Sequence, residues 1–322
     1  MLTKLRAHPS WPWIKRAATA IFFGVVAWLL YQYSRNVDWD EVMKSLRDMS
    51  RPALMTSIAL AATSHLLYSC FDLIGRRYTG HKLPVPTVMA VNFVSYAFNL
   101  CIGSLVGGVA FRYRLYSRLG LNTGVITRVV TMSMLTNWMG YMLLAGLLFA
   151  LHPIALPPSW GMGNHGLQWI GAGLIAVALG YLAACVFKGE RSWRVHGHDL
   201  ELPHWRMALF QLGISCVNWS VMAGVVWVLL GQKVVYTDVL TVLLVGAIAG
   251  VVAHVPAGVG VFEAVFIALL GHRVPEPQIL AALLGYRAIY YIAPLMIAAV
   301  MYLFMELKAK KLKRATGDLQ AA

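Results

Sequence analysis

Charged residues are scarce in this chain. Asp, Glu, Lys and Arg make up 12% of the 322 residues, about half of the roughly 25% that is usual in soluble domains. Apolar residues make up 59%. Because so few charges cannot cover a surface that faces water, the composition excludes an ordinary soluble protein and favours one embedded in a membrane.

Cysteines and the motifs of soluble enzymes are also scarce. The cysteines all lie in apolar stretches, with no Cys-x-x-Cys pair, so neither a disulfide nor a metal site is expected; they are Cys70, Cys101, Cys185 and Cys216. The phosphate loop Gly-x-x-x-x-Gly-Lys-Ser/Thr and the motifs His-Glu-x-x-His and Gly-x-Ser-x-Gly are missing. We therefore expect no enzyme activity and no cofactor, and transport driven by a nucleotide would require another subunit.

Long apolar runs are what the chain has instead. They cover residues 17–33, 53–74, 85–105, 124–151, 167–187, 205–230, 237–254 and 279–305. Several reach the roughly 20 residues that a helix needs to cross a bilayer. The sequence therefore predicts one all-α polytopic membrane domain over residues 1–322, in which residues 307–322 form a basic cytoplasmic tail. No small-residue cleavage site follows the first run, so this run is expected to remain as an anchor.

The basic residues are placed where a membrane topology needs them. The chain has 27 Lys and Arg against 13 Asp and Glu, a net charge of +14. They gather in the N-terminal segment, the 75–84 and 188–206 loops and the tail, which the positive-inside rule places in the cytoplasm, whereas the 152–166 loop has none. The 35–51 segment conflicts with this topology, because it carries basic residues where a periplasmic loop is needed, although acidic residues offset them. We predict a multi-pass protein of a bacterial inner membrane with both termini in the cytoplasm, whose basic residues contact anionic lipids and not nucleic acid.

An internal repeat divides the chain into residues 1–151 and 152–306. When the chain is shifted by 151 residues, it aligns with itself without a gap. The identities are few, but they fall at segment ends and breaks in both halves. They match Pro52 with Pro203, Ser64 with Ser215, Ser69 with Ser220, Lys82 with Lys233, Gly107 with Gly258, Phe111 with Phe262, and Gly120 with Gly271.

Each half contains a glycine-rich break, at 103–108 and at 255–260, followed by a short stretch at 109–119 or 261–270. At 1.5 Å per residue these stretches are too short to cross a bilayer. We therefore predict six full spans and two re-entrant helical hairpins with their tips inside the membrane. Three spans and one hairpin in each half make inverted repeats, the layout of many secondary transporters. The alternative is eight full spans, which would make the repeats parallel.

Opposite charges occupy equivalent positions behind the two breaks. Arg112 in the first half aligns with Glu263 in the second, and if the tips meet, the two are expected to pair, either as a structural lock or as part of a substrate site. Arg114 and Arg118 share a helix face with a four-residue spacing. Their guanidinium groups suit a lipid phosphate, although snorkelling to the interface explains Arg118 equally well.

Other polar residues lie within apolar runs, where they usually face the interior of a bundle. Asn92 and Asn137 favour interhelical hydrogen bonds, and Asp72 is expected to pair with Arg76, one turn further along the helix. The predicted substrate-binding residues are Arg112, Arg114, Glu263, Arg287, Asn99 and Tyr116. The secondary candidates are Arg118, Asn137, Tyr286 and His254, of which His254 is either a proton relay or a structural histidine.

Three segments carry a family resemblance: Val106 to Gly120, the Pro-Ala-Gly-Val-Gly-Val-Phe-Glu segment that ends at Glu263, and Gly-Tyr-Arg-Ala-Ile-Tyr-Tyr, which ends at Tyr291. Over nearly the whole chain, the sequence resembles the transmembrane domain family of lysylphosphatidylglycerol synthases. In the two-part synthases this domain moves aminoacylated lipid between leaflets, while a soluble domain makes that lipid. The resemblance implies that only the lipid-handling role carries over here. It also implies an anionic phospholipid as substrate, such as phosphatidylglycerol or cardiolipin, with roles for Arg112, Arg114, Glu263 and Arg287.

Three functions fit these observations. The first is a flippase or scramblase for an anionic phospholipid. The second is a proton-coupled transporter of a small polar solute, which the same architecture would serve. The third is a membrane partner that does not transport and that stabilises a phospholipid-synthesising enzyme. Lateral openings lined by apolar residues would favour the lipid, and a closed polar cavity would favour the solute. The sequence leaves the oligomeric state open.

Overall fold

The computed structural model describes residues 39–152, 154, 156–157, 161, 164–187, 192–195, 198–253, 255 and 258–320, of which 105–106, 164, 192–195, 198–201 and 308–320 are described by their backbone only. The predicted first span and His254 lie outside the described residues. The first half contains α3 (Trp39–Arg47), α4 (Arg51–Ser69), α5 (Phe71–Thr79), α6 (Val85–Ile102), the π-helix η1 (Ser104–Ala110), α7 (Phe111–Arg118) and α8 (Thr123–Leu151). The second contains α9 (Asn164–Phe187), β1 (Ser192–Val195), β2 (His198–Glu201), α10 (Trp205–Leu229), α11 (Tyr236–Ala253), α12 (Val261–Leu270), α13 (Glu276–Tyr286), the π-helix η4 (Arg287–Ile292) and α14 (Ala293–Gln320).

The helices confirm the prediction of a polytopic helical membrane protein. Within the described residues, seven helical stretches are long and apolar enough to cross a bilayer. They are Arg51–Thr79, Val85–Ile102, Thr123–Leu151, His165–Phe187, Trp205–Leu229, Tyr236–Ala253 and Glu276–Leu307. The antiparallel hairpin of β1 and β2, which the sequence did not predict, lies in the basic loop before α10. Two helices have side-chain N-caps: Ser50 and Asn122 accept hydrogen bonds from backbone N–H groups in the first turns of α4 and α8.

The chain folds back on itself at both predicted breaks. After Gly103, whose φ is +98°, η1 and α7 return along α6, and a Cβ on Gly107 would overlap with the backbone of Asn99. In the second half α12 returns along α11, and a Cβ on Gly246 would lie 2.8 Å from the ring of Phe262. Both breaks are therefore helical hairpins. How deeply either enters the membrane stays a prediction.

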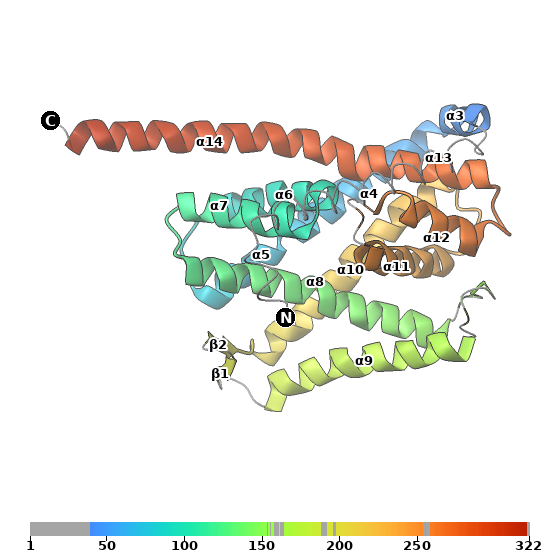
Figure 1. Cartoon of the computed structure of the whole chain (residues 1–322), viewed down its shortest axis with the longest axis horizontal. Coiled ribbons are helices and arrows are strands. Elements are labelled where there is room, and N and C mark those ends of the chain that lie inside the picture. Colours follow the sequence, from blue (N-terminus) through green and yellow to red (C-terminus); the bar gives the residue numbers. More distant parts are fainter. Residues whose placement is uncertain are drawn as a thin grey trace, which may run out of the picture.

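Two helices that the repeat register aligns, α4 and α10, pack against each other in opposite directions. The helices α6 and α11 each have 18 residues, and they begin 151 residues apart, at Val85 and Tyr236. The helices α4 and α10 also occupy equivalent positions and are in contact (Figure 1). They run antiparallel, because Leu60 lies beside Gly224 while Ser64, further along α4, is hydrogen-bonded to Asn218, which comes earlier in α10.

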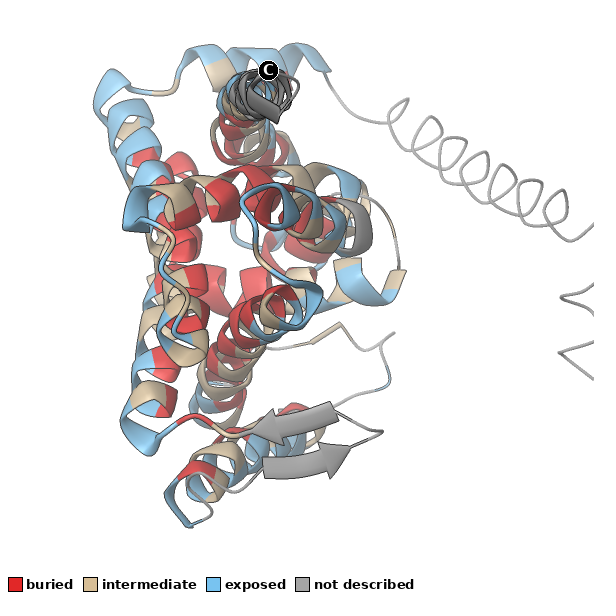
Figure 2. Ribbon diagram, turned by 90° about the vertical axis from the view of Figure 1, so that its left-hand side faces the viewer, coloured by how far each residue is buried: buried red, intermediate tan, exposed pale blue. Residues whose placement is uncertain are grey.

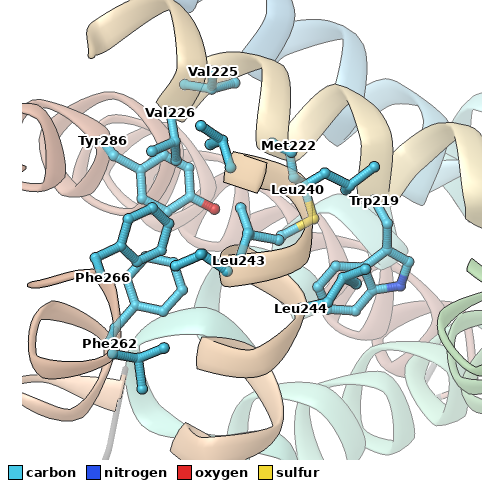
Figure 3. Close-up of a cluster of buried hydrophobic side chains, with 14 of the residues drawn as sticks. Trp219, Met222, Val225, Val226, Leu240, Leu243, Leu244, Phe262, Phe266 and Tyr286 are labelled. Atoms are coloured by element: carbon cyan, nitrogen blue, oxygen red, sulfur yellow. The ribbon is translucent and has the colours of Figure 1, made fainter. Parts of the chain in front are cut away.

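The main apolar core lies where α10, α11, α12 and α13 meet. Figure 3 shows Met222, Leu243, Phe266 and Tyr286 pointing toward one another in this core. Buried residues gather inside the bundle and exposed ones on its outer faces (Figure 2). Many exposed residues are large and apolar, for example Phe304 on α14. An apolar exterior of this kind is suited to lipid.

Candidate functional site

Arg112, the charged residue that follows the first break, is buried and surrounded by hydrogen-bond acceptors. Arg112 donates from Nε to Asp72 Oδ2 at 3.1 Å, from Nη1 to the carbonyl of Gly108 at 2.7 Å, and from Nη2 to Asn92 and to Ser133 Oγ. The side chains of Arg112 and Asp72 are only 3% and 0% exposed. Since a guanidinium carries five N–H donors, four bonds to protein leave little capacity for a ligand. We call Arg112 and Asp72 the sealed pair.

Two predicted ion pairs are therefore wrong. Arg112 does not pair with Glu263, because α7 packs back against its own half, where Asp72 on α5 supplies the carboxylate. Asp72 in turn does not pair with Arg76, which donates to the carbonyl of Leu83 at 2.7 Å. The repeat register aligns Arg112 with Glu263 in sequence, but equivalent positions in two halves need not be neighbours in space.

Tyr116, another predicted substrate-binding residue, belongs to the sealed pair's surroundings. Its hydroxyl donates to Asp72 Oδ2 at 2.8 Å, and the side chain is buried. The imidazole of His81, in the loop between α5 and α6, lies beside the Tyr116 ring. Burial lowers the pKa of His81 below its usual value, and the positive charge of Arg76 lowers it further. A neutral imidazole at neutral pH leaves the charge balance of the sealed pair undisturbed.

Glu263, the charged residue that follows the second break, pairs with Arg287, and both side chains are partly exposed. Arg287 donates from Nε to Glu263 Oε1 at 2.7 Å and from Nη2 to Oε2 at 3.1 Å, which is a bidentate contact. Glu263 also accepts from the backbone N–H of Gly260 at 2.8 Å, at the start of α12. The two side chains are 16% and 14% exposed. We call Arg287 and Glu263 the open pair.

The open pair lies where several elements meet. Glu263 is in the first turn after the second break, and Arg287 begins η4, which contacts α4 and α6. The guanidinium of Arg287 also lies over the Tyr291 ring, 5.7 Å from its centroid. Short π-helical segments are frequent at functional sites. This one places Arg287 between the second hairpin and α6, the first helix of the first hairpin.

A polar network that sequence reasoning missed joins the two halves beside the open pair. Ser64 is hydrogen-bonded to Asn218 at 2.8 Å and to the Tyr290 hydroxyl at 2.7 Å. The Tyr290 hydroxyl also meets the Tyr96 hydroxyl at 3.1 Å, and the Tyr290 carbonyl lies 3.1 Å from His65 Nε2. The network connects α4, α6, α10 and η4. The available signal was the presence of His65 and Asn218 inside apolar runs, which is the same signal that selected Asn92.

The remaining basic candidates bind the last helix. Arg114 Nε donates to Glu306 Oε1 at 3.1 Å, and Arg118 contacts the other carboxylate oxygen. The Tyr302 hydroxyl donates to Glu306 at 3.0 Å. The arginines are 54% and 32% exposed. As their spacing predicted, both arginines lie on one side of α7, since both contact Glu306 of α14, and Figure 1 shows α14 running past α7. We call this contact the α14 latch.

The other candidates have structural surroundings. Asn92 donates to the carbonyl of Tyr68 at 2.7 Å, which confirms its predicted interhelical bond. Asn137 connects helices through its main-chain oxygen, which accepts from Ser215 at 3.1 Å. Asn99 is partly exposed, and its side chain lies against Gly108. Tyr286 stacks on Tyr290 inside the core. Within the described ranges, no three His, Cys, Asp or Glu side chains are placed to bind a metal ion.

A cavity of about 750 Å³ opens between the end of α5 and the start of α10. Most of its lining is apolar, and its polar lining consists mainly of basic side chains. The lining residues are Cys70, Leu73, Ile74, Arg77, His204, Arg206, Met207, Phe210 and Ile214. None of them belongs to the sealed pair or the open pair.

Comparison with known proteins places the chain in a family. The family model described as the lysylphosphatidylglycerol synthase TM region matches residues 17–298. The inner membrane protein YbhN of Escherichia coli is 48% identical over 96% of this chain and 97% of its own length. The phosphatidylglycerol lysyltransferase of Staphylococcus haemolyticus is 25% identical over 89% of this chain, which spans 33% of that enzyme. The matched range includes both hairpins, both ion pairs and the polar network, and the chain therefore belongs to the lysylphosphatidylglycerol synthase transmembrane family.

Proposed function

We propose that this protein moves an anionic phospholipid between the leaflets of a bacterial inner membrane. The observation that carries the proposal is the open pair, a bidentate Arg287–Glu263 contact that remains accessible where the second hairpin meets α6 and η4. A guanidinium fork matches the geometry of a phosphate group. Membership of a family named for lysylphosphatidylglycerol synthases supports a phospholipid ligand.

The open pair suggests how a headgroup is held and released. The phosphate of the lipid competes with Glu263 for Arg287, so the guanidinium has an anionic partner before, during and after passage. Exchange of partners avoids the cost of leaving an isolated charge within the membrane, which is at least about 2.5 kcal/mol. Glu263 keeps its backbone contact with Gly260 while Arg287 is occupied. No covalent step is involved, so the protein acts as a transporter and not as an enzyme.

The arrangement of the halves supports alternating access. In this proposal the two hairpins are re-entrant, the halves are inverted, and both termini face the cytoplasm. The antiparallel contact between the equivalent helices α4 and α10 supports inversion, because parallel repeats would place these helices in the same direction. The sealed pair holds α7 to α5, which leaves the second hairpin as the element that moves.

The experiment is lipid translocation by the purified chain in liposomes. Phosphatidylglycerol with a fluorescent label on the acyl chain is placed in one leaflet, and its arrival in the other is followed by chemical quenching. Arg287→Gln is expected to slow translocation at least tenfold. Arg128→Gln, which changes an exposed arginine on α8 outside both pairs, is the matched control and is expected to leave the rate unchanged.

The same assay separates the alternatives. If protein-containing liposomes move lipid no faster than protein-free liposomes, the proposal is wrong. Proton-driven uptake of a water-soluble solute would then support the solute transporter. A chain that moves neither lipid nor solute but raises the stability of a copurified phospholipid-synthesising enzyme would support the partner role.

A further inference from the structure

The cavity between α5 and α10 is polarised from one end to the other. Arg77, near the end of α5, and Arg206, near the start of α10, both line it, and Cys70 and Ile214, at the other ends of the lining segments of these two helices, line it as well. Arg206 and Ile214 are eight residues apart, which is about 12 Å along a helix. The cavity therefore combines a basic end with apolar walls of about this depth.

The two arginines at the basic end are unneutralised among the described side chains. Arg77 and Arg206 are both exposed, and within the described part of the chain neither forms an ion pair with a carboxylate. The guanidinium of Arg206 lies over the ring of Trp205, 5.4 Å from its centroid. Among the described residues that line the cavity, none is Asp or Glu. Two like charges at one opening attract an anion more strongly than either does alone.

The apolar walls restrict the kind of anion. A soluble phosphate would use Arg77 and Arg206 but would gain nothing from Leu73, Ile74 and Phe210, which form the wall behind them. A phospholipid uses both parts, because its phosphate meets the guanidinium groups while its acyl chains lie along the apolar side chains. Arg77 and Arg206 belong to the basic sequence segments 75–84 and 188–206, which charge distribution places in the cytoplasm.

We propose that this cavity is a binding site for an anionic phospholipid of the cytoplasmic leaflet, with Arg77 and Arg206 as the phosphate ligands. The site is distinct from the open pair and requires no translocation to bind its lipid. Its use as the entrance for transported lipid rests on the proposed function, whereas binding itself does not.

Lipid binding to the whole chain in detergent provides the test. Native mass spectrometry measures the affinities of phosphatidylglycerol and phosphatidylcholine with identical acyl chains. The wild-type chain is expected to bind phosphatidylglycerol at least tenfold more tightly. Arg77→Gln combined with Arg206→Gln is expected to abolish this preference, and Arg128→Gln is expected to keep it. If the double variant does not fold, the two single variants are each expected to lose part of the preference.

Two further measurements distinguish the sources of the anion. Phe210→Trp narrows the apolar part and is expected to weaken binding of both lipids, while leaving the preference for phosphatidylglycerol. Inorganic phosphate at millimolar concentration is expected not to displace the lipid. Equal affinity of the wild-type chain for both lipids, an unchanged preference in the double variant, or displacement by inorganic phosphate would each overturn the proposal. Arg287→Gln is expected to retain this binding, so failure of translocation and failure of the site are distinguishable.

Discussion

The sealed pair and the open pair have the same chemistry and different surroundings. Each contains an arginine and a carboxylate, and each includes a charged residue that follows a hairpin break, Arg112 in the first half and Glu263 in the second. Arg112 and Asp72 are surrounded by further hydrogen-bond partners and are almost fully buried, whereas Arg287 and Glu263 keep part of their surfaces accessible. A charge in an apolar segment is therefore not sufficient to identify a binding site.

The difference assigns the two pairs different tasks. A fully buried pair contributes little net stability over apolar residues but is costly to break, so it fixes one arrangement of the elements that it joins. The sealed pair joins α5 to α7 in this way. An accessible pair costs less to separate, because solvent or a ligand replaces the lost partner. The open pair is therefore the one suited to exchange its carboxylate for a phosphate.

Removing one member of the sealed pair should give the largest effect. Asp72→Ala leaves Arg112 buried without a carboxylate, and we expect it to destabilise the protein by about 3–5 kcal/mol. Thermal unfolding in detergent and the yield of monodisperse protein measure the effect. Arg112→Met in the Asp72→Ala background removes the unpaired charge and should recover part of the loss. An Asp72→Ala protein as stable as the wild type would show that the pair does not hold α7 in place.

The two hairpins should respond differently to an added methyl group. Gly107→Ala places a Cβ against the backbone of α6, which cannot move without shifting η1, and we expect a loss of about 1–3 kcal/mol. Gly246→Ala meets the ring of Phe262, a side chain that can turn, so its loss should be smaller. Thermal unfolding of both variants tests the order. A reversed order would mean that the first hairpin is the looser one.

Neutralising the carboxylate of the open pair should affect transport more than stability. Glu263→Gln keeps the size of the side chain but no longer competes with phosphate for Arg287, so a bound lipid is released slowly. We expect at least a tenfold lower translocation rate, about 1.4 kcal/mol in barrier height, with a smaller loss of thermal stability than for Asp72→Ala. Full transport by a folded Glu263→Gln protein would remove the open pair from the mechanism and leave it a structural contact.

The sequence predicted the helices and the breaks between them but not which charged residues pair with each other. Length and apolar periodicity define a membrane helix locally, and glycine runs mark where it reverses, so the described spans and both fold-back points follow from the chain itself. Partner choice depends on how helices pack. The repeat register offers Glu263 as the partner of Arg112, and only the contact of α7 with α5 in the folded chain selects Asp72.

The polar network and the cavity were missed for related reasons. Ser64, Tyr96 and Tyr290 are common in membrane helices, and only their convergence from three elements makes a network. The sequence uses Arg77 and Arg206 only as basic residues that indicate topology. Because they lie 129 positions apart in the chain, nothing in the sequence indicates that they share a cavity. Their shared cavity exists only once α5 and α10 are neighbours.

The α14 latch gives the smallest expected effect, and salt distinguishes it from the sealed pair. Glu306→Gln removes a carboxylate shared by Arg114 and Arg118, and exposed pairs of this kind contribute about 0.2–1 kcal/mol each. The loss in thermal stability should shrink in about 1 M salt, where the screening length is about 3 Å, while the loss in Asp72→Ala should persist because salt does not reach a buried pair. Unfolding of both variants at low and high salt measures this. If both losses shrank together, the sealed pair would be open to solvent, and the distinction between the two pairs would fail.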